Sequence, residues 1–345
     1  MLKELFLGLD KKPILVEYSD RALEEGEVKV KTIFGAPKHG TELNVYQQDP
    51  FLKTYYDGEA CIFKKRDTPQ TAYGETALGN MWVGEITEMG QGVSGFSMGE
   101  RVAGYGSLRP THIVNQKNVL KMAPRMSWQE AVSFDPLQFA IGGVRDSHLR
   151  FGDTVLVSGL GAIGLMAAQV ARLSGAYLVA VSDPIEKRRK VALENGADIA
   201  FDPLKDDVGL LLRDKTDNLG CDVVIETSGI YKALEQGIRA LAYGGSIACV
   251  GWFRECHIPI NLGYEGHFNQ NKIVFSRAVS DPNNDYPRWN FDRICKEAWD
   301  MLNQGLFKCD NIVDPIVSFD KSDEAYIKYI VEHPEMSVKM GVTFC

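Results

Sequence analysis

The stretch VLVSGLGAIGLMAAQVARLSG constrains the fold more than any other part of the chain. Gly159, Gly161 and Gly164 form G-x-G-x-x-G directly after an apolar strand pattern and directly before a helix pattern. The first glycine permits a tight turn, the second lets the backbone approach a pyrophosphate, and the third lets the helix pack closely on the strand. Amide groups at the start of such a helix stabilise negative charge. The motif predicts a dinucleotide site whose loop includes Ala162 and Ile163; the alternative is a glycine turn with no ligand.

An acidic residue follows this motif at the spacing that a ribose contact requires. Asp183 ends the next strand pattern, about 20 residues beyond the glycines. Its carboxylate can bind both ribose hydroxyls and would repel a 2′-phosphate, so NAD is favoured over NADP. Arg188 and Arg189 lie nearby and are interpreted either as solvated helix charges or as phosphate contacts. Arg188 is therefore kept among the candidate cofactor-binding residues.

The alternation of strand and helix patterns predicts the fold class. From Thr154 onward, apolar strands such as TVLVSG and YLVAVSD alternate with amphipathic helix patterns. Continuous β-branched strands between helices are typical of a parallel sheet covered on both faces. Before about residue 125, short strands and glycine turns follow one another instead. The sequence therefore predicts an α/β protein in which a doubly wound parallel sheet is joined to a β-rich, barrel-like unit.

Length, charge and cysteine content narrow the classes of protein and partner. A chain of 345 residues is long for one core and favours two domains. A net charge of −8 argues against a nucleic-acid partner. No apolar run is long enough to span a membrane, and the N-terminus does not resemble a secretory signal. The seven cysteines include no C-x-x-C pair, so reduced thiols in a cytoplasmic protein are expected.

Several motifs in a fixed order extend the interpretation to nearly the whole chain. They are GEVKVKTIFGAPKHGTEL, LGNMWVGEITEMGQGVSGFSMGERV, RFGDTVLVSGLGAIGLMAAQVARLSGA, CDVVIETSG and GGSIACVGWF. Together they resemble the medium-chain dehydrogenase/reductase family, the alcohol and polyol dehydrogenases. The resemblance implies a GroES-like catalytic domain, residues 1–127 and 280–345, with a Rossmann domain, 128–279, inserted between its parts. It also implies a homodimer or homotetramer, often joined through the edges of the cofactor-domain sheets.

The resemblance implies further cofactor contacts beyond the glycine loop. Thr227 and Ser228 fall where the family's chain passes the adenosine side of the cofactor. The segments that approach the nicotinamide contain Val250, Gly251 and Ala278. Lys339 falls where the family often has a basic residue near the pyrophosphate. The alternative for each of these residues is ordinary packing at a strand end.

The chain departs from the zinc-dependent members of the family at the metal-binding positions. Those members use a cysteine in C-G-[ST]-D, a histidine in G-H-E, and a later carboxylate or cysteine. Here His39, Asn80 and Asp135 occupy the three positions, and Met81 replaces the glutamate of G-H-E. The four-cysteine lobe that holds structural zinc in many relatives is missing. Zinc needs about three nitrogen, sulfur or carboxylate ligands, and only His39 and Asp135 supply such groups here. No bound metal is therefore expected. The alternative is that Glu42 or a mobile side chain completes a zinc site.

Without zinc, another group must take the alcohol proton as hydride leaves. His39 is the candidate, because an imidazole titrates near neutrality. The family geometry would place Asp135 where it can orient the imidazole, Thr41 where a hydroxyl relays the proton, and Asn80 where an amide can bind the substrate oxygen. The alternatives are that His39 binds a metal, that it only packs or binds substrate, or that Lys38 is the proton donor.

An insertion between Leu43 and Leu78 points to the substrate. It is longer than the usual family connection and mixes aromatic with polar side chains. Such a surface suits a sugar or polyol, whereas the alternative is packing on the barrel or on a partner subunit. Trp252, Phe253 and Trp289 are expected either in the same pocket wall or in the core.

Three functions remain open at this stage. The first is NAD-dependent, zinc-independent oxidation of a secondary alcohol on a sugar or polyol, or the reverse ketone reduction. The second is a zinc-free quinone or enoyl reductase using NAD(P)H. The third is a non-catalytic nucleotide-binding relative. Asp183 disfavours the second, because such reductases generally prefer NADPH.

Overall fold

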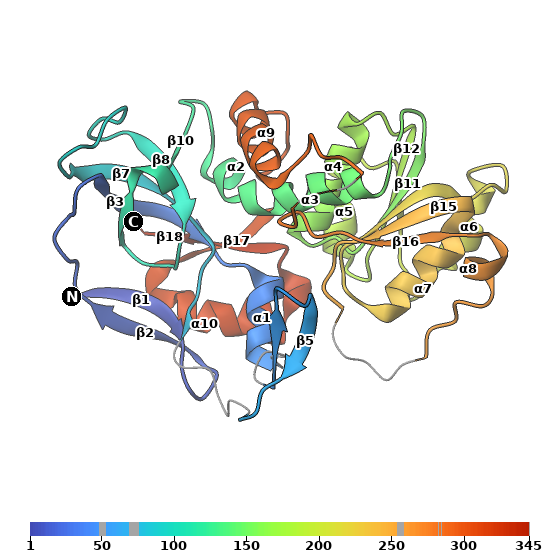
Figure 1. Cartoon of the computed structure of the whole chain (residues 1–345), viewed down its shortest axis with the longest axis horizontal. Helices are drawn as coiled ribbons and strands as arrows, with labels where there is room; N and C mark the ends of the chain where they lie inside the picture. The colour runs from blue at the N-terminus through green and yellow to red at the C-terminus, as the bar shows by residue number, and fades with distance from the viewer. Residues whose placement is uncertain (48–52, 69–75, 254–258, 282, 284, 345) are drawn as a thin grey trace. The chain divides into compact units, whose positions relative to one another are not determined.

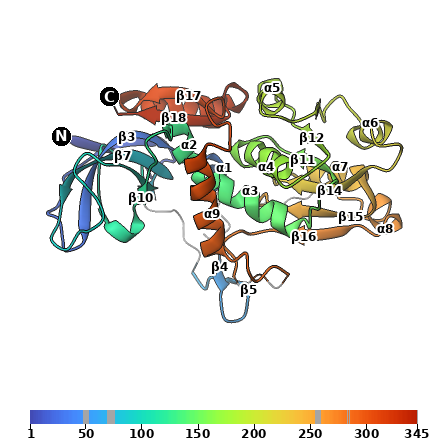
Figure 2. The ribbon, with the colours of Figure 1, turned by 90° about the horizontal axis from the view of Figure 1, so that it is seen from above.

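The computed structural model describes residues 1–47, 53–68, 76–253, 259–281, 283 and 285–344. The chain divides into two compact units (Figures 1 and 2). Unit 1 consists of Met1–Val132 and Val313–Cys345, and unit 2 consists of Ser133–Ile312. Within the described ranges, no helix has the length and apolar character needed to cross a bilayer.

Unit 1 is built mainly from short strands, as the alternating patterns predict. Its strands are β1 (Leu2–Leu7), β2 (Pro13–Tyr18), β3 (Glu27–Ala36), β4 (Thr54–Asp57), β5 (Ile62–Lys65), β6 (Thr76–Ala77), β7 (Met81–Met89), β8 (Arg101–Tyr105), β9 (Thr111–Asn115), β10 (Leu120–Lys121), β17 (Val313–Ser318) and β18 (Lys339–Thr343). Its helical segments are α1 (His39–Gln47), η2 (Gln116–Asn118), α2 (Trp128–Val132), η3 (Phe319–Lys321), α10 (Ser322–Tyr326), η4 (Ile327–Glu332) and η5 (Pro334–Met336).

The main sheet of unit 1 joins the two ends of the chain. Its strand order is β10-β8-β7-β3-β18-β17, with β9 also paired to β3. The C-terminal strand β18 runs antiparallel to β3 and pairs Val342 with Gly35. A smaller sheet has the order β2-β1-β6, and β4 and β5 form a separate two-stranded sheet. Both chain ends therefore contribute to one β-rich unit, which confirms that part of the predicted fold class.

Unit 2 alternates strands and helices along the chain. Its elements are α3 (Phe134–Asp146), β11 (Thr154–Ser158), α4 (Ala162–Leu173), β12 (Leu178–Ser182), α5 (Glu186–Glu194), β13 (Ile199–Phe201), α6 (Val208–Asp214), β14 (Cys221–Glu226), α7 (Tyr231–Ala240), β15 (Leu241–Cys249), α8 (Glu265–Phe268), β16 (Lys272–Phe275) and α9 (Phe291–Gln304).

The sheet of unit 2 is parallel and doubly wound. Its strand order is β13-β12-β11-β14-β15-β16, so the order reverses between β11 and β14. Val157 in the central strand β11 pairs in parallel with Val181 on one side and Ile225 on the other. Ligands of such sheets bind outside the carboxyl ends of the strands at this reversal. The predicted Rossmann architecture is confirmed.

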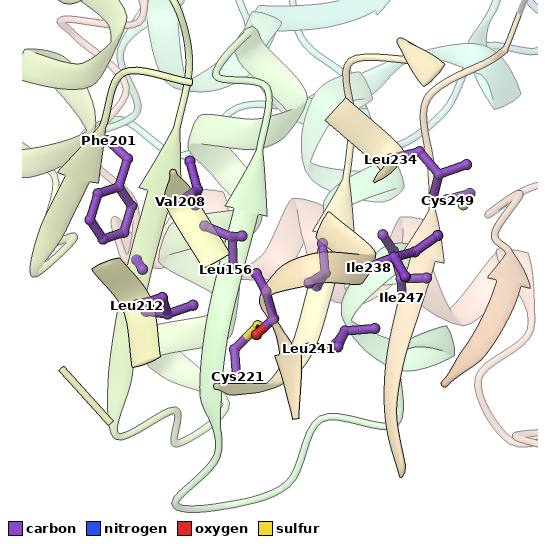
Figure 3. Close-up of a cluster of buried hydrophobic side chains, with 13 residues drawn as sticks. Leu156, Phe201, Val208, Leu212, Cys221, Leu234, Ile238, Leu241, Ile247 and Cys249 are labelled. Atoms are coloured by element: carbon purple, nitrogen blue, oxygen red, sulfur yellow. Dashed lines mark hydrogen bonds between the residues drawn. The ribbon is translucent and has the colours of Figure 1, made fainter. Parts of the chain in front are cut away.

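The core of unit 2 lies where helices cover the sheet. Figure 3 shows Leu156 of β11 and Ile247 of β15 in one buried cluster with Leu212 of α6 and Ile238 of α7. Burying one such side chain stabilises a fold by about 1.5–3 kcal/mol. These helices and strands therefore hold the strand ends, which carry the candidate site, on a rigid base.

The boundary between the units differs from the predicted one at two places. Residues 280–312 were expected with the β-rich domain, and 128–132 with the Rossmann domain. Instead, α9 packs on α3 within unit 2, and Trp299 of α9 meets Phe134 of α3 edge to face at 5.2 Å between ring centroids. Trp128 of α2 stacks on Phe34 of β3 at 5.5 Å within unit 1. These contacts between distant segments cannot be read from local periodicity.

Unit 1 buries a histidine that no sequence motif identifies. His112 of β9 is 3% exposed and stacks on Trp82 of β7, with 4.6 Å between ring centroids. Its Nε2 has no hydrogen-bond partner among the described residues. Burial, aided by the charge of Arg109, lowers the pKa of His112 to about 3. The imidazole is therefore neutral in the folded protein.

We expect His112 to make folding stability depend on acidity. Between about pH 6.5 and 3 the unfolded chain binds a proton that the folded chain does not, so stability falls as pH falls. The loss is about 1.4 kcal/mol per pH unit in that window. His112→Phe keeps an aromatic ring against Trp82 and should lose less stability between pH 7 and pH 5 in urea unfolding. The exposed His333→Phe is the control, and equal losses in wild type and His112→Phe would contradict this account.

Candidate active site

The glycine loop that joins β11 to α4 has the geometry that its sequence predicts. Gly159 has φ +86°, a conformation that favours glycine, and its N–H donates to the carbonyl of Ser182 at 2.8 Å. A Cβ added at Gly164 would lie 1.8 Å from the carbonyl oxygen of Gly159. Only a residue without a side chain therefore lets α4 start this close to the end of β11.

Gly161 leaves open space at the start of α4. It is the N-cap residue of α4, and no side chain caps the helix there. A Cβ at Gly161 would meet no atom of the described residues within 4 Å. The first amides of a helix have no partner inside it and attract anions. Gly161, Ala162 and Ile163 are each partly exposed at this position, so the loop has room for a phosphate group against its backbone.

Asp183 lies directly beside this loop. One carboxylate oxygen accepts a hydrogen bond from Leu160 N at 2.7 Å, and the other accepts from Ile185 N at 2.8 Å. The side chain is thereby fixed at the end of β12. Each oxygen of a carboxylate has about two lone-pair sites, so the group retains capacity to accept from ribose hydroxyls.

The two arginines of α5 are not the solvated helix charges that one interpretation expected. The side chain of Arg188 is 18% exposed and lies 4.0 Å from the Asp183 carboxylate. Burial lowers the pKa of Arg188. Arg189 is 16% exposed, pairs with Asp202 at 3.4 Å and donates to the carbonyl oxygen of Asp183 at 2.7 Å. Both guanidinium groups therefore help to fix the end of β12.

The turn after β14 is tied to the glycine loop through Thr227. Its hydroxyl donates to the carbonyl of Gly159 at 2.7 Å. Ser228 was also predicted to contact the cofactor, but its hydroxyl and its backbone N–H both donate to the carboxylate of Glu226. These two hydroxyls therefore shape the site by holding protein groups in place.

Glu226 is a site residue that the sequence reasoning missed. It ends β14 with its side chain completely buried, and its second carboxylate oxygen accepts from Gly229 N at 3.1 Å. Burial raises the pKa of Glu226 to about 7. The signal was present in CDVVIETSG, because a charged residue inside an apolar strand must have buried partners.

The ends of β15 and β16 approach α3 through two adjacent glycines. A Cβ at Gly143 would lie 2.6 Å from a methyl group of Val250, and one at Gly142 would lie 2.8 Å from the Cβ of Ala278. Gly251 N donates to the carbonyl of Glu226 at 3.0 Å. Val250 and Gly251, which follow β15, and Ala278, which follows β16, therefore lie at the carboxyl edge of the sheet, as the Rossmann arrangement requires.

His39, the first residue of α1, contacts the strand β18. The backbone N–H of Met340 donates to Nε2 of His39 at 3.0 Å. A nitrogen that accepts a hydrogen bond carries no proton, so this contact requires a neutral ring with its proton on Nδ1. While Nε2 accepts from Met340 N, it has no free lone pair for a proton. To act as the predicted proton acceptor, the His39 ring would have to give up its hydrogen bond to Met340.

Asn80 presents an amide donor in a fixed position. Its backbone N–H donates to Ala36 O at 3.1 Å, and its carbonyl accepts from Gly106 N at 3.0 Å. Within the part of the chain that the structure describes, its Nδ2 is buried without a hydrogen-bond partner. An unsatisfied buried donor costs about 1–3 kcal/mol, which favours a ligand oxygen as its partner. Thr41, by contrast, is exposed.

Glu42 connects α1 to two distant segments of unit 1. One carboxylate oxygen accepts from Gly79 N at 2.9 Å, and the other accepts from the hydroxyl of Tyr326 at 2.8 Å. Burial raises the pKa of Glu42, while the charge of Lys339 opposes that shift. Lys339 is itself buried and donates to the carbonyl of Pro37 at 2.9 Å. The structure therefore gives Lys339 partners inside unit 1, although the resemblance implied a pyrophosphate contact.

Asp135 lies in the other unit from His39, Thr41 and Asn80. It is buried in the first turn of α3. Its predicted pairing with His39 stays a prediction. Among the described residues, no group of three or more His, Cys, Asp or Glu side chains forms a set that could hold a metal ion.

The predicted substrate surface is described only in part, because residues 48–52 and 69–75 of the insertion lie outside the described residues. Its β4–β5 hairpin exposes Tyr56 and Phe63, whose ring centroids are 5.3 Å apart. Of the three other aromatic candidates, Trp252 is about half exposed. Phe253 packs against the core of unit 2, and the ring of Trp289 lies against Arg293 at 4.2 Å.

Comparison with known proteins agrees with this fold. A family model described as zinc-binding dehydrogenase matches residues 162–293. D-guloside 3-dehydrogenase of Escherichia coli strain K12 is 45% identical over 350 positions, which cover 99% of this chain and 100% of the relative. The chain belongs to the zinc-binding dehydrogenase family. The family resemblance predicted from the motifs is confirmed.

Two further similar proteins share less sequence identity with this chain. L-Threonine 3-dehydrogenase of Pyrococcus furiosus is 29% identical over 335 positions, which cover 87% of each chain. The crystal structure of 2R,3R-butanediol dehydrogenase from Bacillus subtilis has a TM-score of 0.78 at 21% identity and covers 100% of both chains. That likeness shows the shared fold.

Two alanine substitutions in the glycine loop should differ strongly in their cost to stability. Gly164→Ala forces a methyl group against the Gly159 carbonyl and should destabilise unit 2 by about 3 kcal/mol or more. Gly161→Ala places its methyl group in open space and should cost at most about 1 kcal/mol. Thermal unfolding of both variants checks this, and equal losses would show that the two positions are not packed as described.

Proposed function

We propose that this dehydrogenase oxidises a secondary alcohol on a sugar or polyol with NAD as hydride acceptor, or catalyses the reverse ketone reduction. The observation that carries the proposal is the match over the whole chain to a relative named D-guloside 3-dehydrogenase. A relative at 45% identity named for a sugar derivative supports a substrate of the same chemical class.

The site geometry supports a dinucleotide and favours NAD. Open space over Gly161 and the uncapped start of α4 suit a pyrophosphate. Asp183, fixed beside the loop by Leu160 N, suits the ribose hydroxyls and repels a 2′-phosphate. Arg188 is already close to Asp183, so its charge is partly neutralised by the carboxylate. NAD is therefore the expected cofactor.

The residues of unit 1 would bind and polarise the substrate. When bound, the nicotinamide ring supplies the hydride acceptor. The buried Nδ2 of Asn80 would donate a hydrogen bond to the reacting oxygen and stabilise the negative charge that develops there. Its backbone is held by Ala36 and Gly106, so no reorganisation is needed when that charge appears.

The family name implies a catalytic zinc ion, and the donors at the expected positions do not fit one. Nε2 of His39 accepts from Met340 N, and Asn80 offers a neutral amide, which is a poor ligand for zinc. Glu42, the remaining route to a metal, has a donor on each carboxylate oxygen. We therefore propose catalysis without zinc, with no step through a metal.

Two further expectations stay proposals. The exposed Tyr56 and Phe63 of the β4–β5 hairpin offer apolar faces of the kind that stack on sugar rings. A homodimer or homotetramer is still expected, and the edge strand β16 exposes Ile273 and Phe275, which suits pairing between sheet edges.

The function is tested by following reduction of NAD and of NADP with a panel of sugars, glycosides and polyols. We expect turnover with at least one sugar derivative, and a preference of about tenfold or more for NAD over NADP because of Asp183. Metal content is measured on the same preparation. Gly161→Ala should weaken the apparent affinity for NAD while the protein stays folded.

Three outcomes would overturn parts of this proposal. Reduction of a quinone or an enoyl compound by NADPH, with no alcohol oxidised, would establish the reductase alternative. Binding of NAD without turnover of any compound in the panel would support the non-catalytic nucleotide-binding alternative. Stoichiometric zinc that is required for turnover would show that the site recruits a metal despite its donors.

Variants at Asn80 and His39 test the site in unit 1. Asn80→Ala should lower kcat by about 100-fold, because one donor to the developing charge is lost, while NAD affinity stays unchanged. His39→Ala should lose most turnover. His39→Gln keeps an oxygen that can accept from Met340 N, so it should retain more activity than His39→Ala.

The dependence of kcat/KM on pH separates two roles for His39. If the ring only holds its place against Met340, His39→Gln keeps the wild-type profile. If His39 accepts the alcohol proton, His39→Gln is as inactive as His39→Ala, and the acidic limb of the wild-type profile is missing from any residual activity. The second result would support the predicted role of His39 as proton acceptor.

A further inference from the structure

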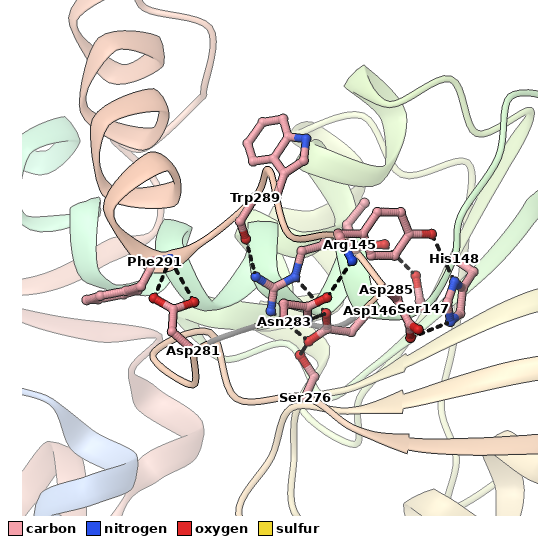
Figure 4. Close-up of polar contacts among 12 residues, drawn as sticks. Arg145, Asp146, Ser147, His148, Ser276, Asp281, Asn283, Asp285, Trp289 and Phe291 are labelled. Carbon is pink, nitrogen blue, oxygen red and sulfur yellow. Dashed lines mark hydrogen bonds and ion pairs between the residues drawn. The ribbon is translucent and has the colours of Figure 1, made fainter.

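Asp146, the last residue of α3, is the centre of a buried polar cluster in unit 2. Figure 4 shows Arg145, Ser276 and Asn283 converging on its carboxylate. Arg145 donates from Nε at 2.6 Å and from Nη2 at 3.1 Å. The hydroxyl of Ser276 donates at 2.6 Å, and Nδ2 of Asn283 donates at 3.0 Å. Four hydrogen bonds therefore satisfy one buried carboxylate.

The same cluster holds the far end of the segment that follows β16. Nη1 of Arg145 donates to the carbonyl oxygen of Trp289 at 2.6 Å, just before α9 begins (Figure 4). The side chains of Arg145 and Asp146 are 4% and 8% exposed. A buried ion pair contributes little net stability, because desolvation offsets the attraction. The arrangement is better explained by the position that it imposes on Ser276, Asn283 and Trp289.

The segment held in this way begins at the edge of the second nucleotide half-site. A doubly wound sheet is built from two mononucleotide-binding halves. The half formed by β11, β12 and β13 carries the glycine loop and Asp183, which suit the pyrophosphate and the adenosine ribose. The half formed by β14, β15 and β16 is therefore left for the nicotinamide end. Ser276 directly follows β16, and Ala278 is buried two residues later against Gly142 of α3.

We propose that Asp146 is a positioning residue for the nicotinamide end of the cofactor, acting through Ser276 and the backbone that leads to Ala278. The inference rests on the proposed dinucleotide function of the same unit. Asp146 itself does not touch the cofactor. It sets the distance between α3 and the strand end against which the nicotinamide ring packs.

The experiment compares two ligands that share the adenosine and pyrophosphate parts. Isothermal titration of the full chain is carried out with NAD and with ADP-ribose, which lacks the nicotinamide ring. Asp146→Asn should weaken NAD binding about tenfold and leave ADP-ribose binding within about twofold of wild type. Ser276→Ala removes a single hydroxyl contact and should show a smaller loss with the same preference.

A matched substitution controls for the loss of a charge in this region. Asp285 lies in the same segment, is largely exposed, and is 3.8 Å from the ring of His148. Asp285→Asn should leave the binding of both ligands unchanged. If Asp146→Asn does not fold, Ser276→Ala supplies the comparison, because it creates only a small cavity.

The possible results separate this inference from the proposed function. Loss of NAD binding alone in the Asp146 or Ser276 variants supports the positioning role. Equal weakening of both ligands, or no weakening of either, overturns it while the dinucleotide function stands. A wild-type protein that binds neither ligand overturns the dinucleotide function, and the positioning role with it.

Discussion

The site in unit 2 depends on one backbone contact, that of Gly164 against the carbonyl of Gly159. No side chain separates the end of β11 from the start of α4, since a Cβ at Gly164 would lie 1.8 Å from that oxygen. The same carbonyl accepts from the hydroxyl of Thr227 at 2.7 Å, which ties β14 to the loop. Leu160 N, within the loop, holds the carboxylate of Asp183. The open space over Gly161 and the position of the Asp183 carboxylate therefore both follow from the close packing of β11, β14 and α4.

Buried carboxylates connect the remaining strand ends to this base. Glu226 accepts from the turn that follows β14, and Asp146 accepts from α3 and from the segment after β16. Desolvating a carboxylate costs several kcal/mol, which hydrogen bonds must offset. The carboxylates of Glu226 and Asp146 therefore fix the positions of the groups that donate hydrogen bonds to them. In Glu226 desolvation outweighs these hydrogen bonds, because burial raises its pKa to about 7.

The sequence predicted the parts of the site that follow local rules. The three glycines lie within six residues, and each has a steric reason that holds in any βαβ unit. Asp183 was found because strand length fixes its distance from the loop. His39 was chosen by its place in a family motif, and its role as proton acceptor stays a prediction. Its contact with Met340 was not predicted, because the two residues are 301 positions apart in the chain. Asp146 was missed because Ser276 and Asn283 are 130 and 137 residues away in the chain. Glu226 was missed although its partners lie within three residues of it.

The sequence by itself determined the fold class, the dinucleotide loop and the absence of the usual zinc ligands from their motifs. These follow from residue type and spacing, which fix backbone conformation, helix starts and donor chemistry. Only the tertiary structure decided which hydrogen-bond partners the polar side chains have. It placed Met340 N on the imidazole of His39, left the Nδ2 of Asn80 without a partner among the described residues, and joined Asp146 to Ser276 across 130 residues. The physical reason is that hydrogen bonding depends on distances of about 3 Å, which are set by how distant segments pack.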